Sequence, residues 1–279
     1  MFQPLRNVVL LLLLEAGRCL LMTADAHDKR LTALDLFSGI GGFSLGLERT
    51  GGFRTVAFCE IEPYCRAVLR RHWPDVPIFD DVRQLDSLML DDDSHSLPVD
   101  VICGGFPCQD ISYAGDGAGL AGERSGLWSE FARLIGELRP RYAIVENVAA
   151  LLNRGIDTIL GDLARIGYDA EWSVVSACSM GAPHVRRRVF IVAYPDSIYG
   201  RPRVWSPDAR QDRPLQEIDG FESSRAGWRA RMENPSELYG GANGLPHGME
   251  RNRAIGNAIV PAIPEAIGRA ILQAEGMSI

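Results

Sequence analysis

Lysine is nearly absent from this chain. Lys29 is the only lysine among 29 basic residues, and 36 Asp plus Glu give the 279 residues a formal net charge of −7. Arginine is therefore the basic side chain available to contact phosphates and base edges of an anionic partner. The basic charge is local, because residues 183–253 hold 12 Arg against 9 Asp plus Glu, a net of +3, which leaves −10 for the rest. The acidic average thus does not exclude an anionic partner.

Paired cysteines are also absent. The six cysteines form no C-x-x-C pair, and they are Cys19, Cys59, Cys65, Cys103, Cys108 and Cys178. Neither a zinc site nor a disulfide framework is indicated, and we expect no metal. Most of these cysteines are predicted to be small core residues.

The chain has no internal repeat and no apolar run long enough to cross a membrane. Residues 8–14 are apolar and follow Arg6, which superficially resembles a signal peptide. The run is too short for a membrane span, and Glu15 follows it at once. We expect residues 1–30 to be an N-terminal extension, either an extra helix or the product of a start codon assigned too early.

What the sequence has is an alternation of short apolar strands and helical segments. Strands are predicted near residues 31–37, 53–59, 76–79, 99–103, 141–146, 170–177 and 188–194. Helices are predicted near residues 42–50, 61–72, 125–138, 156–166 and 258–274. In a chain that is 46% hydrophobic, this alternation predicts an α/β fold with a doubly wound, mostly parallel sheet and helices on both faces.

The alternation breaks down between residues 195 and 250, which are rich in Gly, Pro and Arg. An irregular excursion of this length inside a compact fold is usually functional, so we expect a small recognition region there. The main domain would then occupy residues 31–194, and residues 251–279 would return to it as a C-terminal helix.

A glycine-rich turn and two acids point to a bound nucleoside. Residues 34–43, LDLFSGIGGF, run from an apolar strand through glycines into a helical pattern. Such a turn lets a ligand approach the backbone and the N–H groups of the helix N-terminus. Glu60 ends the next strand about 20 residues later, where doubly wound folds place an acid on ribose hydroxyls. Asp81 could accept a hydrogen bond from an adenine amine, although either acid alone would more often be a solvated loop residue.

A cysteine in a tight turn is the second chemical signal. Residues 104–110, GGFPCQD, place Cys108 directly after an apolar run. A thiol at the carboxyl end of a buried strand is well placed to attack a ligand. An isolated Pro-Cys pair would be an ordinary loop, but later strands bring Glu146 with Asn147 and the arginines 186–188.

The order of these motifs resembles that of the DNA cytosine carbon-5 methyltransferases. The resemblance spans residues 31–270 and rests on residues 35–42, 105–109, 146–148, 186–188 and 253–261. It implies a class I S-adenosylmethionine-dependent methyltransferase fold in which residues 195–250 recognise the target. It also implies an enzyme that transfers a methyl group from S-adenosylmethionine to carbon 5 of a flipped-out cytosine in a short sequence of double-stranded DNA.

The resemblance assigns catalysis to Cys108, Glu146, Arg186, Arg188, Asn147 and Pro107. Cys108 would add to carbon 6 of the base and form a covalent adduct. Glu146 would hold ring nitrogen 3 and supply a proton, so burial should raise its pKa. Arg186 and Arg188 would hold the base carbonyl oxygen and a nearby phosphate, and Asn147 would orient the loop of Cys108.

For the cofactor, S-adenosylmethionine, the implied binding residues are Asp35, Phe37, Ser38, Gly39, Gly41, Glu60, Ile61, Asp81, Val82, Gly105, Pro107, Asn257 and Ala258. Double-stranded DNA is the implied partner of a monomeric enzyme that acts in the cytoplasm of a bacterial cell or a phage-infected host, without membrane association. A cognate restriction endonuclease acting separately is compatible with this assignment.

Three alternatives stay open. The nearest is the same chemistry on RNA, although the Cys-Phe-Thr signature expected there is absent. The second is a catalytically weak DNA-binding relative, because His184 stands where the family has a glutamine. The third is a thiol-dependent nicotinamide dehydrogenase, which would leave Glu146, Asn147 and the late Gly256 and Asn257 unexplained.

Overall fold

The computed structural model describes residues 28–86, 91–92, 95–96, 98–107, 126–182, 185–196, 254 and 256–277. Two compact units are distinguished, Met1–Arg30 and Leu31–Ile279, and every element named below belongs to the second. Cys108, His184 and the expected recognition region from residue 197 onward lie outside the described residues.

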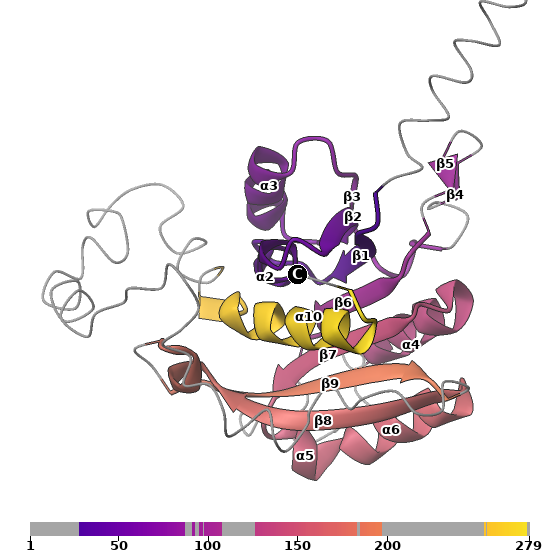
Figure 1. Ribbon diagram of the computed structural model, residues 1–279, viewed down its shortest axis with the longest axis vertical. Helices are drawn as coiled ribbons and strands as arrows, with labels where there is room; N and C mark the ends of the chain where they lie inside the picture. Colours follow the sequence, from indigo (N-terminus) through magenta and orange to yellow (C-terminus); the bar gives the residue numbers. More distant parts are fainter. Residues whose placement is uncertain are drawn as a thin grey trace, which may run out of the picture. The chain divides into compact units, whose positions relative to one another are not determined.

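A seven-stranded sheet forms the centre of this unit (Figure 1). Its strands, in spatial order, are β3 (Ile78–Phe79), β2 (Phe53–Cys59), β1 (Leu31–Leu36), β6 (Val101–Gly105), β7 (Tyr142–Val148), β9 (Arg187–Pro195) and β8 (Tyr168–Ser176). Neighbours from β3 to β7 are parallel, whereas β9 is antiparallel to both β7 and β8. The doubly wound, mostly parallel sheet expected from the sequence is confirmed.

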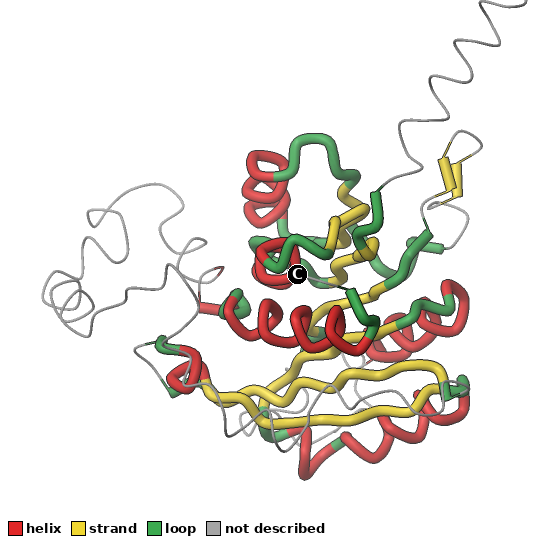
Figure 2. Tube along the Cα trace, in the orientation of Figure 1, coloured by secondary structure: helices red, strands yellow, loops and turns green. Residues whose placement is uncertain are grey.

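Helices cover both faces of the sheet (Figure 1, Figure 2). They are α2 (Gly42–Arg49), α3 (Pro63–His72), α4 (Gly126–Leu138), α5 (Leu151–Arg154), α6 (Ile156–Arg165) and α10 (Ala262–Ala274), with the 3-10 helix η3 (Ala177–Met180). The sequence pattern did not predict α5, η3 or the short antiparallel pair β4 (Asp91–Asp92) and β5 (His95–Ser96). None of the helices in the described part of the chain is long and apolar enough to cross a membrane.

The core divides into two apolar clusters because side chains along a strand point alternately to opposite faces. On β1, Leu34 and Leu36 pack in the cluster that holds Phe131 of α4. Ala33 packs in the other cluster, with Ile267 of α10. Both faces of the sheet are therefore covered, which explains why its strands read as nearly continuous apolar runs.

Helix α10 begins later than its isoleucine spacing predicts. The pattern indicated a helix over residues 258–274, but α10 begins at Ala262, directly after Pro261. A residue that precedes proline is biased away from helical geometry, so Val260 cannot extend the helix backwards easily. Ile259 consequently lies in an irregular segment, which is free to enter the wall of a cavity.

Candidate active site

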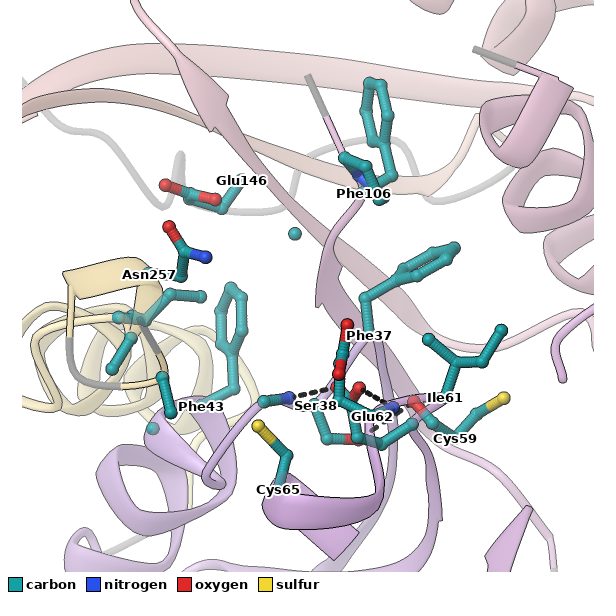
Figure 3. A pocket seen from close by; sticks show the side chains of 18 of the residues that line it. Phe37, Ser38, Phe43, Cys59, Ile61, Glu62, Cys65, Phe106, Glu146 and Asn257 are labelled. Carbon is teal, nitrogen blue, oxygen red and sulfur yellow. Dashed lines mark hydrogen bonds between the residues drawn. The ribbon is translucent and has the colours of Figure 1, made fainter. Parts of the chain in front are cut away.

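A cavity of about 720 Å³ lies at the edge of the sheet where β1, β2, β6 and β7 end (Figure 3). Because β9 runs in the opposite direction, its first residues reach the same edge. The carboxyl edge of a doubly wound sheet is the usual position of a ligand site. The cavity joins two sets of residues that are far apart in the sequence, and the two are described in turn.

The turn after β1 forms the floor of the first half of the cavity. Gly39 and Gly41 have φ of 54° and 84°, in the left-handed region that glycine enters without strain. Phe37 also has a positive φ, of 52°, and its ring stacks on Phe131 with centroids 6.4 Å apart. The Ser38 hydroxyl donates to the Asp35 carbonyl at 2.5 Å. These contacts fix the backbone that the sequence predicted to approach a ligand.

Asp35 stands behind this turn rather than in the cavity wall. Its carboxylate is completely buried, and Oδ2 accepts hydrogen bonds from the hydroxyl of Ser44 at 2.7 Å and from its backbone N–H at 3.3 Å. No described residue donates to Oδ1. Burial raises the pKa of Asp35 to about 8, against the opposing hydrogen bonds from Ser44. The expected cofactor residue Asp35 therefore supports the first turn of α2.

Glu60 joins the glycine turn to the end of β2. Its Oε2 accepts a hydrogen bond from the backbone N–H of Gly39, and its Oε1 accepts one from that of Glu62, both at 2.7 Å. The residue is only 7% exposed, yet it lines the cavity. Next to it, Ile61 is 61% exposed and offers an apolar surface on the same wall (Figure 3). An acid beside an apolar surface suits a ribose beside a base.

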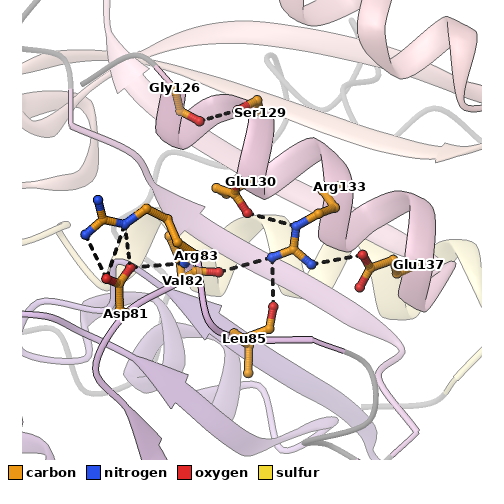
Figure 4. Close-up of polar contacts among 9 residues, drawn as sticks. All are labelled: Asp81, Val82, Arg83, Leu85, Gly126, Ser129, Glu130, Arg133 and Glu137. Carbon is orange, nitrogen blue, oxygen red and sulfur yellow. Dashed lines mark hydrogen bonds and ion pairs between the residues drawn. The ribbon is translucent and has the colours of Figure 1, made fainter. Parts of the chain in front are cut away.

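Asp81 and Val82 extend this wall beyond β3. The carboxylate of Asp81 accepts hydrogen bonds from Arg83 Nε at 2.9 Å and Nη2 at 2.7 Å, and these bonds lower the pKa of Asp81 (Figure 4). Each carboxylate oxygen can accept more than one hydrogen bond, so Asp81 keeps acceptor capacity for a ligand.

Arg133 of α4 holds the same loop from outside the cavity (Figure 4). Its guanidinium donates to the carbonyls of Val82 at 3.2 Å and Leu85 at 2.7 Å. Glu130 and Glu137 bind the guanidinium from the helix side, at 2.8 and 2.9 Å. This role was not predictable from sequence motifs, because Arg133 donates to backbone carbonyls, which every residue carries.

Glu146 and Arg188 form the second half of the cavity. Arg188 Nε lies 2.9 Å from Glu146 Oε1 as an ion pair, but no described donor is aligned for a hydrogen bond to this oxygen. Glu146 is 9% exposed, and burial raises its pKa even though the charges of Arg188 and Arg186 oppose the shift. A Cβ on Gly105 would lie 2.5 Å from Glu146 Oε2, so the absence of a side chain there leaves room for the carboxyl group.

The turn before Cys108 is tied to the end of β7. Asn147 Nδ2 donates to the carbonyl of Phe106 at 3.1 Å, and the Phe106 ring packs on Trp128 with centroids 5.7 Å apart. Pro107 lines the cavity, and Cys108 lies outside the described residues. The described turn thus leads the chain to Cys108 from the cavity wall.

Arg186 and the segment before α10 form the remaining part of the cavity lining. The Arg186 guanidinium donates to the carbonyl of Gly256 and, at 3.1 Å, to that of Asn257. Asn257, Ala258 and Ile259 line the cavity beside the glycine turn.

The cavity also includes residues that sequence reasoning missed. They are Gly42, Phe43, Cys59, Glu62, Pro63, Tyr64, Cys65, Asp80, Arg83, Phe106, Leu127, Val148, Ala254 and Ile259. Several of them lie within the motifs quoted above, namely Gly42, Phe43, Phe106, Val148, Ala254 and Ile259, so the motifs were a usable signal for these, whereas Leu127 had none. Among the residues that the structure describes, no group of three or more His, Cys, Asp or Glu side chains could hold a metal ion.

Comparison with known proteins identifies a family and several similar proteins. Residues 31–219 match the family model of the C-5 cytosine-specific DNA methylase. The chain is 35% identical over 203 residues to Type II methyltransferase M2.BsuMI of Bacillus subtilis (69% of this chain, 48% of that protein). It is 38% identical over 168 residues to Type II methyltransferase M.Eco47II of Escherichia coli (58% and 39%). It thus spans less than half the length of these relatives.

Solved structures agree with the fold. An Escherichia coli prophage protein named as a DNA modification methyltransferase shares 30% identity and a TM-score of 0.52, over 60% of this chain and 47% of that one. A Spodoptera frugiperda DNMT2 variant has a TM-score of 0.51 at 20% identity, over 61% and 51% of the two chains. The second likeness concerns the fold alone.

Proposed function

The chain belongs to the C-5 cytosine-specific DNA methylase family, and from this premise we propose that it transfers a methyl group from S-adenosylmethionine to carbon 5 of cytosine in a short sequence of double-stranded DNA. One observation carries the proposal. A single cavity is lined both by the Glu60 and glycine-turn half and by the Glu146 and Arg188 half, directly beside the turn that leads to Cys108.

The first half of the cavity fits the cofactor. S-adenosylmethionine, when bound, supplies an electrophilic methyl group on a sulfonium. Glu60 would accept hydrogen bonds from the ribose hydroxyls, and the exposed side chain of Ile61 would pack on the adenine. Asp81 would accept from the adenine amine. The buried Glu60 carboxylate, already oriented by two backbone N–H groups, is the observation that supports this fit.

The second half of the cavity fits the base. Carbons 5 and 6 of a cytosine are inaccessible in a duplex, so the base must rotate out of the stack to enter the cavity. The Cys108 thiolate would form a bond to carbon 6, and ring nitrogen 3 would take a proton from Glu146 as this bond forms. Carbon 5 would then act as the nucleophile toward the methyl group. Methyl transfer would break the bond between the methyl group and its sulfonium sulfur. Loss of the carbon 5 proton, return of the ring nitrogen 3 proton to the Glu146 carboxylate and cleavage of the bond between the Cys108 sulfur and carbon 6 would complete the reaction.

The described contacts support these roles. The raised pKa of Glu146 favours the protonated acid that addition requires. Arg188, paired with Glu146, would place its positive charge near the carbonyl oxygen of the base. Asn147, through the Phe106 carbonyl, would hold the turn that carries Cys108. DNA recognition would fall to the arginine-rich residues 195–250, with the enzyme acting in the cytoplasm of a bacterial or phage-infected cell.

The test detects both the methylated product and the covalent intermediate. The full chain, incubated with radiolabelled methyl donor and duplex DNA, should label carbon 5 of cytosine, and bisulfite sequencing of DNA from expressing cells should show one short motif. DNA that contains 5-fluorocytosine should trap a covalent adduct with the wild type, and Cys108→Ser should abolish it. A transfer RNA substrate and reduced nicotinamide serve as controls. Preferential labelling of RNA, consumption of nicotinamide, or trapping unaffected by Cys108→Ser would contradict the proposal.

A further inference from the structure

The two arginines that the sequence pairs have different partners in the structure. Arg186 directly precedes β9, Arg188 is its second residue, and both line the cavity. Arg188 pairs with the Glu146 carboxyl group at 2.9 Å. Arg186 instead donates to two consecutive backbone carbonyls, those of Gly256 and Asn257. The resemblance implied for both arginines a role toward the base and a phosphate, whereas the described contacts give the two side chains different partners.

The segment that Arg186 contacts forms part of the cavity wall. Asn257, Ala258 and Ile259 line the cavity between the base half and the glycine turn. A Cβ on Gly42 would lie 2.6 Å from the Ile259 carbonyl oxygen, so the segment packs directly on the first residue of α2. Its position is therefore set from two sides, by α2 and by the Arg186 guanidinium.

Arginine is suited to this contact. Its planar guanidinium presents several N–H donors in a fixed fork and can bind two neighbouring carbonyls at once. A lysine ammonium lacks that fixed geometry. Hydrogen bonds from a charged donor are also stronger than neutral ones, so two of them can hold Gly256 and Asn257, after which residues 258–260 have neither helix nor strand structure.

We propose that Arg186 is a positioning residue that clamps residues 256–259 into the cavity wall, and thereby sets the affinity for the cofactor. This role rests on the proposed function. It also places the clamp within a few residues of Ala254, where the described chain resumes after residues 197–253.

The test uses the full chain without DNA. Arg186→Gln should weaken binding of S-adenosylhomocysteine about tenfold, and Arg186→Lys should weaken it by a smaller factor, since it keeps the charge but loses the fork. Hydrogen exchange at residues 256–259 should become faster in both variants. The control is Arg187→Gln, because Arg187 is exposed and does not line the cavity. In turnover, the KM for S-adenosylmethionine should rise by a larger factor than kcat falls.

The outcomes separate this proposal from the proposed function. If Arg186→Gln and Arg186→Lys leave both exchange and cofactor affinity unchanged and weaken only DNA binding or kcat, Arg186 contacts the substrate and the clamp is refuted. If the wild type binds no S-adenosylhomocysteine but exchange at residues 256–259 still accelerates in the variants, the clamp stands and the cofactor assignment falls. If Arg186→Gln does not fold, Arg186→Lys and its exchange rates decide the question.

Discussion

Glu60 and Glu146 sit at the ends of two parallel strands, β2 and β7, and face one cavity in contrasting surroundings. They are almost equally buried, at 7% and 9% exposure. Both oxygens of Glu60 accept a backbone N–H, whereas Glu146 has an arginine ion pair and one oxygen without an aligned donor. Burial alone thus does not separate the two roles proposed for these acids, cofactor binding for Glu60 and proton transfer for Glu146. The donors around each acid do.

The comparison is tested most strongly at Glu146. Glu146→Gln keeps the size of the side chain but has no proton to transfer to the base, so methyl transfer should fall by about 10²–10⁴-fold. Affinity for S-adenosylhomocysteine should stay within about twofold, because the change lies in the other half of the cavity. Single-turnover kinetics and calorimetry measure the two effects. A variant that keeps more than about a tenth of the wild-type rate would remove Glu146 from proton transfer.

Asp35 provides a third kind of buried acid, with donors on one oxygen only. Its folded pKa of about 8 lies above the ordinary 3.8, so the folded state binds more protons than the unfolded state between these values. The stabilisation is complete below the lower value and is lost as pH rises through the upper one. We expect the free energy of unfolding to fall by up to about 1.4 kcal/mol per pH unit in this window.

Asp35→Asn should remove that slope, because the amide does not titrate. Urea unfolding of the wild type and the variant between about pH 5 and about pH 8 measures the difference. Two parallel stability profiles would show that the Asp35 carboxyl group titrates alike in the folded and unfolded states.

A Glu→Gln substitution at Glu60, in contrast to the one at Glu146, should act on cofactor binding. In Glu60→Gln, the amide NH₂ would face the N–H of Gly39 or Glu62, so one hydrogen bond would become a repulsive contact. We expect cofactor affinity to weaken by about 1–3 kcal/mol, with a much smaller change in kcat at saturating cofactor. Calorimetry with S-adenosylhomocysteine gives the affinity. Unchanged binding in a folded variant would exclude Glu60 from the cofactor site.

The smallest effect is expected outside the cavity. Arg133→Met removes the hydrogen bonds to the Val82 and Leu85 carbonyls and should lower the free energy of unfolding by about 1–2 kcal/mol. The matched control is Arg165→Met, which removes only an exposed pair with Asp162 and should cost less than about 0.5 kcal/mol. Equal destabilisation of the two variants would show that Arg133 does not hold the loop.

The bounds of helices and strands were more predictable from the sequence than the hydrogen-bond partners of individual side chains. The bounds of β1 and β2 came within a residue, because each apolar run is followed at once by loop residues. The start of α10 was wrong, since its isoleucine spacing continues past Pro261. The acids at the strand ends were identifiable from motif spacing. The partners of Arg133 and Arg186 were not, because every residue carries a carbonyl and only the fold decides which one comes near.

The reversed direction of β9 determines how many residues are needed to bring the chain back to the cavity. Its nine residues begin at the cavity and end at Pro195, on the opposite edge of the sheet, while the chain returns to the cavity at Ala254. The distance to be covered is about 30 Å, which roughly ten extended residues can span. Residues 197–253 exceed that need several times over. Connectivity therefore accounts for only a small part of this stretch, and most of its length is left for the recognition role proposed above.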